Sequence, residues 1–334
     1  MAEARGEGDP PVADRSLSRT GKRRILWQEL PPEVRRGIES CVGASVIGAV
    51  SQPGGFSEGL ASLLALADGR RVFVKAASRV GASAVAEFHL REIAITARLP
   101  AVAPVPRLVD SYDDGVWVAG IYAEIQGRLP SRPWRHGELS RVLDALTALS
   151  TDLTPAPVDP ALLAAPRLGG WRALAQSAGG GALACLAAIT PWAADRIDDL
   201  VTLEADADRD LAGRTLLHGD LYGFNILLGV DGVSAVDWPH AWIGAPFCDV
   251  VTLLSSASID GVDPEQYARD HPLIKDVDPR HVDVLLAAHS GFLLRLVTTA
   301  DPSADPSLIA MASALGVASL RWLQERGLGS RARR

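Results

Sequence analysis

LLHGDLYGFNILL, residues 216–228, and VSAVDW, residues 233–238, decide the fold of this chain. Both stretches contain short apolar runs, and a turn at Asp231-Gly232 separates them. Two apolar runs joined by a short glycine-containing turn are typical of a β-hairpin. Such a hairpin would bring Asn225, just before its first strand, to the same end as Asp237, which is expected to end its second strand.

These residue types suit phosphoryl transfer. Asp220, at the mouth of a tight loop, can accept a proton from an attacking hydroxyl group. Asn225, the only asparagine in the chain, offers a neutral oxygen ligand for Mg²⁺, and Asp237 adds a carboxylate. Phosphoryl transfer depends mainly on positioning and charge neutralisation, so a base and two Mg²⁺ ligands supply much of what it needs.

The spacing of these residues resembles that of a known family. His-Gly-Asp, four further residues, Asn, and then Asp-Trp is similar to the pattern of the aminoglycoside phosphotransferase family of kinase-like enzymes, and GAPFCD at residues 244–249 fits it too. The resemblance implies a bilobal protein-kinase-like fold that uses ATP and Mg²⁺. It also implies that Asp220 is the catalytic base and that Asn225 and Asp237 bind Mg²⁺. His218 and Asp249 would then support the loop by hydrogen bonds.

The chain before this stretch is expected to form an antiparallel sheet with one inserted helix. Residues 1–24 lack an apolar period and are expected to form a mobile tail. Residues 25–125 are expected to form a nucleotide-binding lobe. Its predicted elements are a helix at 31–40, strands at 44–51, 60–67, 71–77, 105–112 and 116–124, and a helix at 84–99.

Residues 126–325 are expected to form a larger, mainly helical lobe that carries the catalytic loop, the metal site and the acceptor-binding helices. Helices are predicted at 138–150, 170–189, 193–212, 246–258, 278–299 and 305–325. The proline-rich segment 151–170 is expected to be an ordered loop, and residues 326–334 a basic tail. The sequence therefore predicts an α+β fold of two lobes.

A kinase also needs a lysine on the third strand and a carboxylate on the next helix to orient it. Lys75, in VFVKA at residues 72–76, has that position, and it is one of only three lysines in an arginine-rich chain. A lysine ammonium is a compact point charge for phosphates. Glu92 is the better match for the carboxylate, and Glu87 is the reserve candidate.

Two further segments of the first lobe are expected to contact ATP. A glycine-bearing turn between the first two strands lets backbone N–H groups approach phosphates, and Gly54-Gly55 with Ser57 stand there. By the resemblance, the linker between the lobes binds adenine through the Ala123 carbonyl and the Ile125 N–H, with Tyr122 lining the pocket.

Two other function classes compete with a kinase. GFSEG, residues 55–59, matches the G-x-S-x-G nucleophile elbow, so a hydrolase would use Ser57 with a later Asp and a His such as His289. That elbow should join a strand to a helix, whereas strands are predicted on both sides of this segment. A non-catalytic kinase-fold binding protein is the other alternative, but it would not need to keep the base, the metal ligands and Lys75. The absence of G-x-x-x-x-G-K-[ST] excludes a P-loop kinase.

Composition limits the partners and the location. The net charge of −7 gives no reason to expect binding to nucleic acid or an anionic membrane, since both need a basic surface. The three cysteines are widely spaced, which argues against a zinc site or a disulfide framework and fits a reducing cytoplasm. Neither a signal peptide nor an uninterrupted apolar stretch of membrane-spanning length is present, so a cytoplasmic protein is expected.

The sequence leaves the acceptor open. Residues 237–249 are too short for a protein-kinase acceptor segment, which favours a small-molecule hydroxyl acceptor: an aminoglycoside or other antibiotic, a sugar, a choline-like alcohol or homoserine. The segment 260–283 is rich in acids that would attract a cationic acceptor or would simply form a solvated surface. Trp238, His240 and Trp242 would stack on a sugar or nucleoside, or pack beneath the loop.

Overall fold

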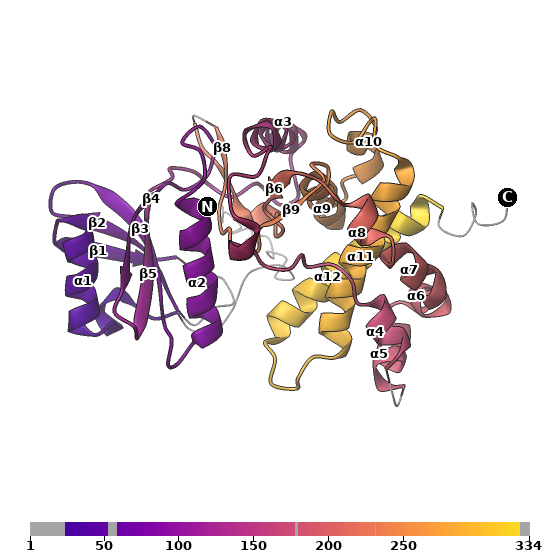
Figure 1. The fold of residues 1–334 in the computed structure, drawn as a ribbon, viewed down its shortest axis with the longest axis horizontal. Coiled ribbons are helices and arrows are strands. Elements are labelled where there is room, and N and C mark those ends of the chain that lie inside the picture. Colours follow the sequence, from indigo (N-terminus) through magenta and orange to yellow (C-terminus); the bar gives the residue numbers. More distant parts are fainter. Residues whose placement is uncertain (1–23, 53–58, 178–179, 231, 328–334) are drawn as a thin grey trace, which may run out of the picture.

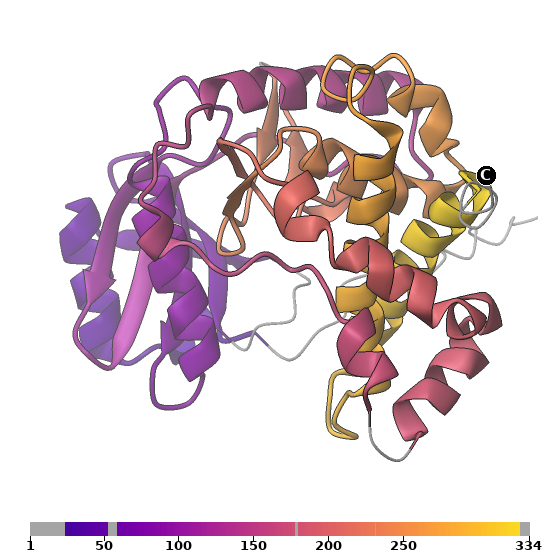
Figure 2. The same cartoon turned by 45° about the vertical axis from the view of Figure 1, so that its right-hand side comes forward.

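A computed structural model describes residues 24–52, 59–177, 180–230 and 232–327. The chain forms a sheet lobe, residues 24–123, and a helical lobe, residues 129–327, joined by a linker, residues 124–128 (Figure 1). Figure 2 shows the same two parts from a second direction. The predicted mixed α+β fold is confirmed.

The sheet lobe contains one antiparallel sheet of five strands. They are β1 Val46–Ser51, β2 Leu60–Leu66, β3 Arg71–Ser78, β4 Leu108–Asp113 and β5 Trp117–Ala123. Their order in the sheet is β1-β2-β3-β5-β4, and every neighbouring pair is antiparallel. The five strands predicted from the sequence are therefore confirmed, with ends that differ by a few residues.

Two helices cover opposite faces of this sheet, α1 Pro32–Val42 and α2 Ser83–Thr96 (Figure 1). In α1, Val34 and Ile38 are one turn apart and pack in one core cluster with Val72 and Val74 of β3. Side chains of a strand alternate between its faces, so Lys75 projects toward the other face. That face meets α2, which lies on the side of the helical lobe (Figure 1).

The helical lobe is built mainly from short and long helices around one large core. Its helices are α3 His136–Asp152, α4 Trp171–Ala175, α5 Gly181–Ile189, α6 Pro191–Asp195, α7 Ile197–Glu204, α8 Ala207–Asp210, α9 Cys248–Ala257, α10 Pro264–Ala268, α11 Pro279–Thr298 and α12 Pro306–Glu325. Short 3-10 turns occur at η2 Trp27–Glu29, η3 Pro160–Leu162, η4 Gly223–Asn225 and η5 Ser258–Asp260.

Two small antiparallel pairs of strands also belong to this lobe. β6 Thr215–Leu217 pairs with β9 Trp242–Gly244, and β7 Ile226–Leu228 pairs with β8 Val233–Ala235. The linker runs beside the second pair, because Arg128 and Leu228 form an isolated antiparallel bridge. The hairpin predicted from residues 216–238 is therefore present, although Asp231 of its turn lies outside the described residues.

The predicted helices differ from the structure in three places. The predicted helix 170–189 is divided into α4 and α5, and 193–212 into α6 to α8. Gly180 precedes α5 with φ of 71°, and Pro191 begins α6, so neither residue continues a preceding helix. The sequence analysis missed α10, whose start was nonetheless readable: Asp263 accepts hydrogen bonds from two N–H groups of its first turn, and Pro264 follows.

The two last helices are long and apolar enough to span a membrane by length and composition alone. In this fold α11 and α12 pack against each other in the helical lobe, and 61% of the apolar stretch of α11 is buried. The predicted tails, 1–24 and 326–334, lie outside the described residues except for Arg24, Arg326 and Gly327. Arg326 forms ion pairs with Glu265 and Asp283, so the chain is held at this point.

Candidate active site

The loop after β6 adopts a conformation that its glycine makes possible. Gly219 has φ of 73°, and a Cβ atom there would lie 2.3 Å from the His240 carbonyl oxygen. An L-residue would therefore meet both backbone strain and a clash. The tight turn places His218 inside the core and Asp220 at its edge, since His218 is fully buried and 16% of the Asp220 side chain is exposed.

Hydrogen bonds from both sides hold this loop. The Asp249 carboxylate at the start of α9 accepts the N–H groups of His218 at 2.7 Å and Gly219 at 3.1 Å. The His218 ring accepts the Asp220 N–H at Nδ1, and Nε2 lies 2.9 Å from the Val236 carbonyl oxygen. Only the tautomer protonated at Nε2 satisfies both contacts. Burial lowers the pKa of His218 to about 4, which keeps the ring neutral, and burial raises the pKa of Asp249 to about 6.

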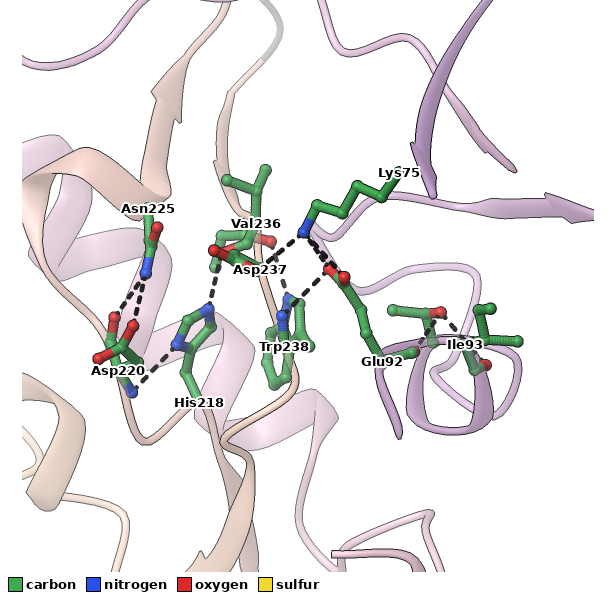
Figure 3. Close-up of polar contacts among 11 residues, drawn as sticks. Lys75, Glu92, Ile93, His218, Asp220, Asn225, Val236, Asp237 and Trp238 are labelled. Carbon is green, nitrogen blue, oxygen red and sulfur yellow. Dashed lines mark hydrogen bonds and ion pairs between the residues drawn. The ribbon is translucent and has the colours of Figure 1, made fainter. Parts of the chain in front are cut away.

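Asn225 orients Asp220. Its amide Nδ2 donates to the Asp220 backbone oxygen at 2.8 Å and to Oδ2 of the same residue at 3.2 Å. Because the amide is planar, its carbonyl oxygen is directed away from Asp220 (Figure 3). Asn225 is fully buried, so this orientation is fixed by the η4 turn and the start of β7.

Asp237 lies two residues beyond β8, so the expectation that it ends the strand is wrong. Its φ of 74° makes it the only described non-glycine residue with positive φ. Aspartate tolerates this region better than most residues, and such strain is frequent at functional sites. The Val236 N–H donates to the Asn225 carbonyl at 2.9 Å, which brings the backbones of the two predicted metal ligands together.

The Lys75 ammonium contacts carboxylates from both lobes. Nζ lies 2.8 Å from both oxygens of Glu92 on α2 and 2.8 Å from Oδ1 of Asp237. Burial disfavours its charge, but the Asp237 and Glu92 carboxylates outweigh burial and raise the pKa of Lys75 above 10.5. Glu92 also accepts the Trp238 N–H at 3.3 Å. Glu92 rather than Glu87 is therefore the partner of the lysine.

Figure 3 shows these groups in sequence across the site. Asn225 and Asp220 lie on one side of Asp237, and Lys75 with Glu92 on the other. The predicted base, the two predicted oxygen ligands and the Lys75 ammonium thus lie near one another where the lobes meet. Among the described residues no group of three or more His, Cys, Asp or Glu could hold a metal ion by itself. Asn225 and Asp237 fit Mg²⁺ held partly by substrate phosphates, because that ion favours few protein oxygens.

The residues predicted to bind adenine lie at the end of β5 and in the linker. Ala123, the last residue of β5, pairs with Val72 of β3, and its N–H donates to the Arg107 carbonyl. Neither backbone group of Ile125 has a hydrogen-bond partner among the residues that the structure describes. Tyr122 is only 2% exposed, so its ring packs between the sheet and α2.

Gly54, Gly55 and Ser57 lie outside the described residues. The strands that flank them, β1 and β2, are antiparallel neighbours, which is not the strand-to-helix context of a nucleophile elbow. His289, the partner suggested for Ser57, is buried in α11 and contacts Tyr222 and Ser319.

The aromatic residues after Asp237 differ in their burial: Trp238 is buried, whereas His240 and Trp242 are half-buried. Trp238 is fully buried and donates to the Ala235 carbonyl at 2.9 Å, so it cannot stack on a ligand. The His240 ring meets Phe88 of α2 edge to face, with ring centroids 5.1 Å apart. Trp242 lines a cavity of about 460 Å³ beneath residues 160–169.

Most acidic residues of segment 260–283 have structural partners. Asp260 pairs with Arg132, and Glu265 and Asp283 both pair with Arg326. Asp263 and Asp278 accept N–H groups at the starts of α10 and α11. These carboxylates thus form ion pairs and helix caps within the protein, and they do not form one acidic surface for a cationic acceptor.

Sequence reasoning missed two contacts of the catalytic loop. Arg167, in the proline-rich segment, donates to Oδ1 of Asp220 at 2.7 Å. The Tyr222 hydroxyl lies 3.0 Å from Nε2 of His289. Neither contact has a local signature, since the paired residues are 53 and 67 positions apart.

Comparisons with solved structures support the fold. A thermostable mutant of aminoglycoside phosphotransferase APH(4)-Ia, in a ternary complex with AMP-PNP and hygromycin B, matches with a TM-score of 0.57 and 15% identity over 90% of this chain and 100% of that chain. The amicoumacin kinase hAmiN, in complex with AMP-PNP, Ca²⁺ and Ami, matches with a TM-score of 0.53 and 13% identity over 90% and 97%. Choline kinase from Cryptosporidium parvum Iowa II matches with a TM-score of 0.53 and 11% identity over 90% and 92%.

Sequence comparisons give the family. A search of curated protein sequences found no match. The profile of the phosphotransferase enzyme family, APH, matches residues 54–272, a segment that includes the lysine strand, the linker, the catalytic loop and the start of the helices after it. With more than half of its length matched and a kinase-like fold around these residues, the chain belongs to the phosphotransferase enzyme family.

Proposed function

We propose that this protein is a Mg²⁺-dependent kinase that transfers the γ-phosphoryl group of ATP to a hydroxyl group of a small molecule. One observation carries the proposal. Asp220, Asn225, Asp237, Lys75 and Glu92 come from both lobes and form two groups of contacts at their junction, Asp220 with Asn225 and Lys75 with Glu92 and Asp237. The Val236 N–H, which donates to the Asn225 carbonyl, brings the two groups side by side. A fold that only bound a ligand would have no need to place a base, oxygen ligands and an oriented lysine together.

The described residues have distinct roles in this reaction. The acceptor hydroxyl would donate its hydrogen bond to Asp220, and its proton would move to that carboxylate as the new oxygen–phosphorus bond forms and the bond to the ADP oxygen breaks. Asn225 and Asp237 would hold Mg²⁺, which neutralises phosphate charge when bound. Lys75, oriented by Glu92, would hold the α- and β-phosphates.

The structural neighbours support a nucleotide and a small acceptor, since two of them were solved with AMP-PNP. Their names give different acceptors: hygromycin B, amicoumacin and choline. We propose a hydroxylated antibiotic, such as an aminoglycoside, as the first class to test, with sugars, choline-like alcohols and homoserine as the metabolite alternatives. The three cysteines are all free thiols, which supports a cytoplasmic location.

The test is an ADP-coupled assay with Mg-ATP over hydroxylated antibiotics, sugars and amino alcohols. Asp220→Asn should lower kcat about 10³-fold with the acceptor that reacts, because general-base catalysis contributes about 10²- to 10⁴-fold. It should leave the Kd for Mg-ATP within about twofold, since Asp220 is the acceptor-side group. Asp276→Asn, at an exposed residue, is the matched control.

Three outcomes would contradict the proposal. If Asp220→Asn turns over as fast as the wild type, Asp220 is not the catalytic base. Nucleotide binding without phosphorylation of any hydroxyl compound would favour a binding protein. Ester hydrolysis that depends on Ser57, together with no thermal shift by any nucleotide, would favour a hydrolase.

A further inference from the structure

Asp220 has a cationic neighbour, Arg167, which has no role in the reaction described above. The Arg167 Nη1 donates to Oδ1 of Asp220 at 2.7 Å, while the Asn225 amide donates to Oδ2 at 3.2 Å. The Arg167 side chain is 35% exposed and the Asp220 side chain 16% exposed. The guanidinium group therefore lies at the solvent-facing side of the base, where reacting groups would enter.

The segment that carries Arg167 is anchored to the helical lobe. The Gly169 N–H donates to the Ala288 carbonyl of α11 at 2.7 Å, and the Gly170 N–H donates to Glu204 at 2.6 Å. The Arg167 guanidinium carbon lies 5.8 Å from the centre of the Phe292 ring, which is within cation–π range. The chain two and three residues after Arg167 is thus held by hydrogen bonds and its side chain by Asp220 and Phe292, which suits a preorganised group rather than a loose surface residue.

The Arg167 guanidinium group has more N–H donors than its contact with Asp220 uses. It carries five N–H donors in a planar fork. Within the described part of the chain, Asp220 is the only hydrogen-bond partner of this side chain. A planar fork is well suited to phosphate oxygens, because two of its N–H groups can bind two oxygens together. Arg167 can therefore keep one contact with Asp220 and still bind an anion.

The position of Arg167 distinguishes it from Lys75. Lys75 contacts Glu92 and Asp237, on the opposite side of the site from Asp220 (Figure 3). In an in-line transfer the phosphoryl group moves toward the hydroxyl oxygen that is hydrogen-bonded to Asp220. The cation nearest to that destination is the one already bonded to the base, which is Arg167.

We propose that Arg167 is a catalytic residue that donates hydrogen bonds to the transferring phosphoryl group and neutralises its charge. This inference rests on the proposed kinase function. Arg167 moves no proton and forms no covalent bond. It stabilises charge on the phosphoryl oxygens as the bond to ADP breaks and the bond to the acceptor forms. It also orients Asp220 before the acceptor arrives.

Hydrolysis of Mg-ATP by water, in the absence of any acceptor, tests this role before the acceptor is known. The variants are Arg167→Ala and Arg167→Lys, with Arg172→Ala as the matched control, because Arg172 is an exposed arginine on neighbouring α4. Arg167→Ala should lower the hydrolysis kcat about 10²-fold, the loss typical of one transition-state donor. The KM for ATP should stay within about twofold. Added guanidinium ion should restore part of the rate in Arg167→Ala and none in Asp220→Asn.

A binding measurement gives a second readout that needs no turnover. Arg167→Ala should weaken binding of MgADP with aluminium fluoride, which mimics the transferring phosphoryl group, at least about tenfold. Binding of MgADP alone should be unchanged. If hydrolysis by the wild type is too slow to detect, this comparison of the two ligands becomes the test of the role of Arg167. A thermal unfolding midpoint close to that of the wild type shows that the variant is folded.

Two results would overturn the inference without affecting the proposed function. If Arg167→Ala changes neither ATP hydrolysis nor the binding of MgADP with aluminium fluoride, the role of Arg167 is limited to its ion pair with Asp220. If these two measurements are unchanged but the KM for the acceptor rises, Arg167 binds an anionic group of the acceptor instead of the transferring phosphoryl group. If the wild type binds no Mg-nucleotide at all, the proposed function fails first, and the inference fails with it.

Discussion

The Lys75 ammonium group lies 2.8 Å from carboxylate oxygens of both lobes, those of Glu92 and Asp237. Glu92 is 2% exposed, so its charge is compensated by this lysine and by one backbone N–H group rather than by solvent. Lys75 therefore has a structural role in addition to its expected role in binding ATP phosphates.

Lys75→Met should reduce both stability and ATP use. The loss of stability should be about 3 kcal/mol, because the substitution leaves a buried carboxylate without its partner. The KM for ATP should rise at least about tenfold. Urea unfolding and the ADP-coupled assay measure the two effects.

A double variant separates these two roles. Lys75→Met with Glu92→Gln removes both charges and should recover most of the lost stability, while ATP use stays impaired. If the double variant regains ATP kinetics as well, Lys75 acts only through the fold and its assignment to the phosphates is wrong.

At the residue scale, contacts could be predicted from the sequence where the geometry was local. Asn225 is five positions from Asp220, so one turn brings them together. Glu87 and Glu92 are five residues apart, which on a helix turns their side chains to different faces. The buried positions of α2 include Ala86, His89 and Glu92, three apart on one face. Arg167 gave no such signal, since only the tertiary fold brings it to Asp220.

At the scale of elements, the catalytic loop is anchored on the last three long helices. The Tyr222 hydroxyl contacts His289 of α11, whose Nδ1 lies 3.0 Å from the Ser319 hydroxyl of α12. The Ser319 oxygen lies 2.8 Å from the Ser255 oxygen of α9. All of these groups are buried, so the row of hydrogen bonds links the loop that carries Asp220 to the helical core.

Tyr222→Phe should test this anchor. It leaves a buried ring nitrogen of His289 without its partner, which should cost about 1–2 kcal/mol of unfolding free energy. The kcat should fall several-fold while the Kd for Mg-ATP stays unchanged. Tyr267→Phe is the matched control, because its hydroxyl contacts exposed His136 at 2.6 Å and should cost little. Equal losses in the two variants would show that the buried row has no special role.

Element boundaries followed local signals in the sheet lobe more closely than in the helical lobe. Asp68-Gly69 predicted the turn between β2 and β3, and Gly69 has φ of 88° there. In the helical lobe the alanine-rich segment 170–212 looked like two helices but forms five. Alanine favours a helix at every position of such a segment. An alanine-rich sequence therefore does not show where one helix ends and the next begins.

At the scale of the molecule, α2 joins the two lobes at the site. Glu92 accepts the Trp238 N–H, Arg91 donates to the Pro239 carbonyl at 3.4 Å, and Phe88 packs against His240. The two-lobe arrangement was predictable, because the order of strands, helix and catalytic loop in the sequence required it. These contacts across the junction were not, since they depend on how α2 is rotated against residues 236–240.

Buried histidines make the stability of the whole molecule sensitive to pH. Burial lowers the pKa of His89 to about 3 and those of His218 and His289 to about 4, all below the ordinary value of 6.5. The folded protein keeps these rings neutral, whereas the unfolded chain binds protons below pH 6.5. Their contribution is therefore fully present above pH 6.5 and is lost as the pH falls toward 4. Asp249 acts in the opposite direction, because burial raises its pKa to about 6 and the folded state takes up its proton first.

These three histidines and Asp249 together should lower the unfolding free energy by about 3 kcal/mol between pH 7.5 and pH 5.5, since each neutral histidine contributes about 1.4 kcal/mol per pH unit below its unfolded pKa. Urea unfolding at the two pH values measures it. His289→Asn should lower stability at pH 7.5 but reduce the difference between the two pH values by about 1.4 kcal/mol, because one proton no longer binds on unfolding. His136→Asn, at an exposed histidine, should leave that difference nearly unchanged. A His289→Asn protein with the full wild-type pH dependence would show that this ring is not kept neutral by the fold, and that the acid sensitivity arises elsewhere.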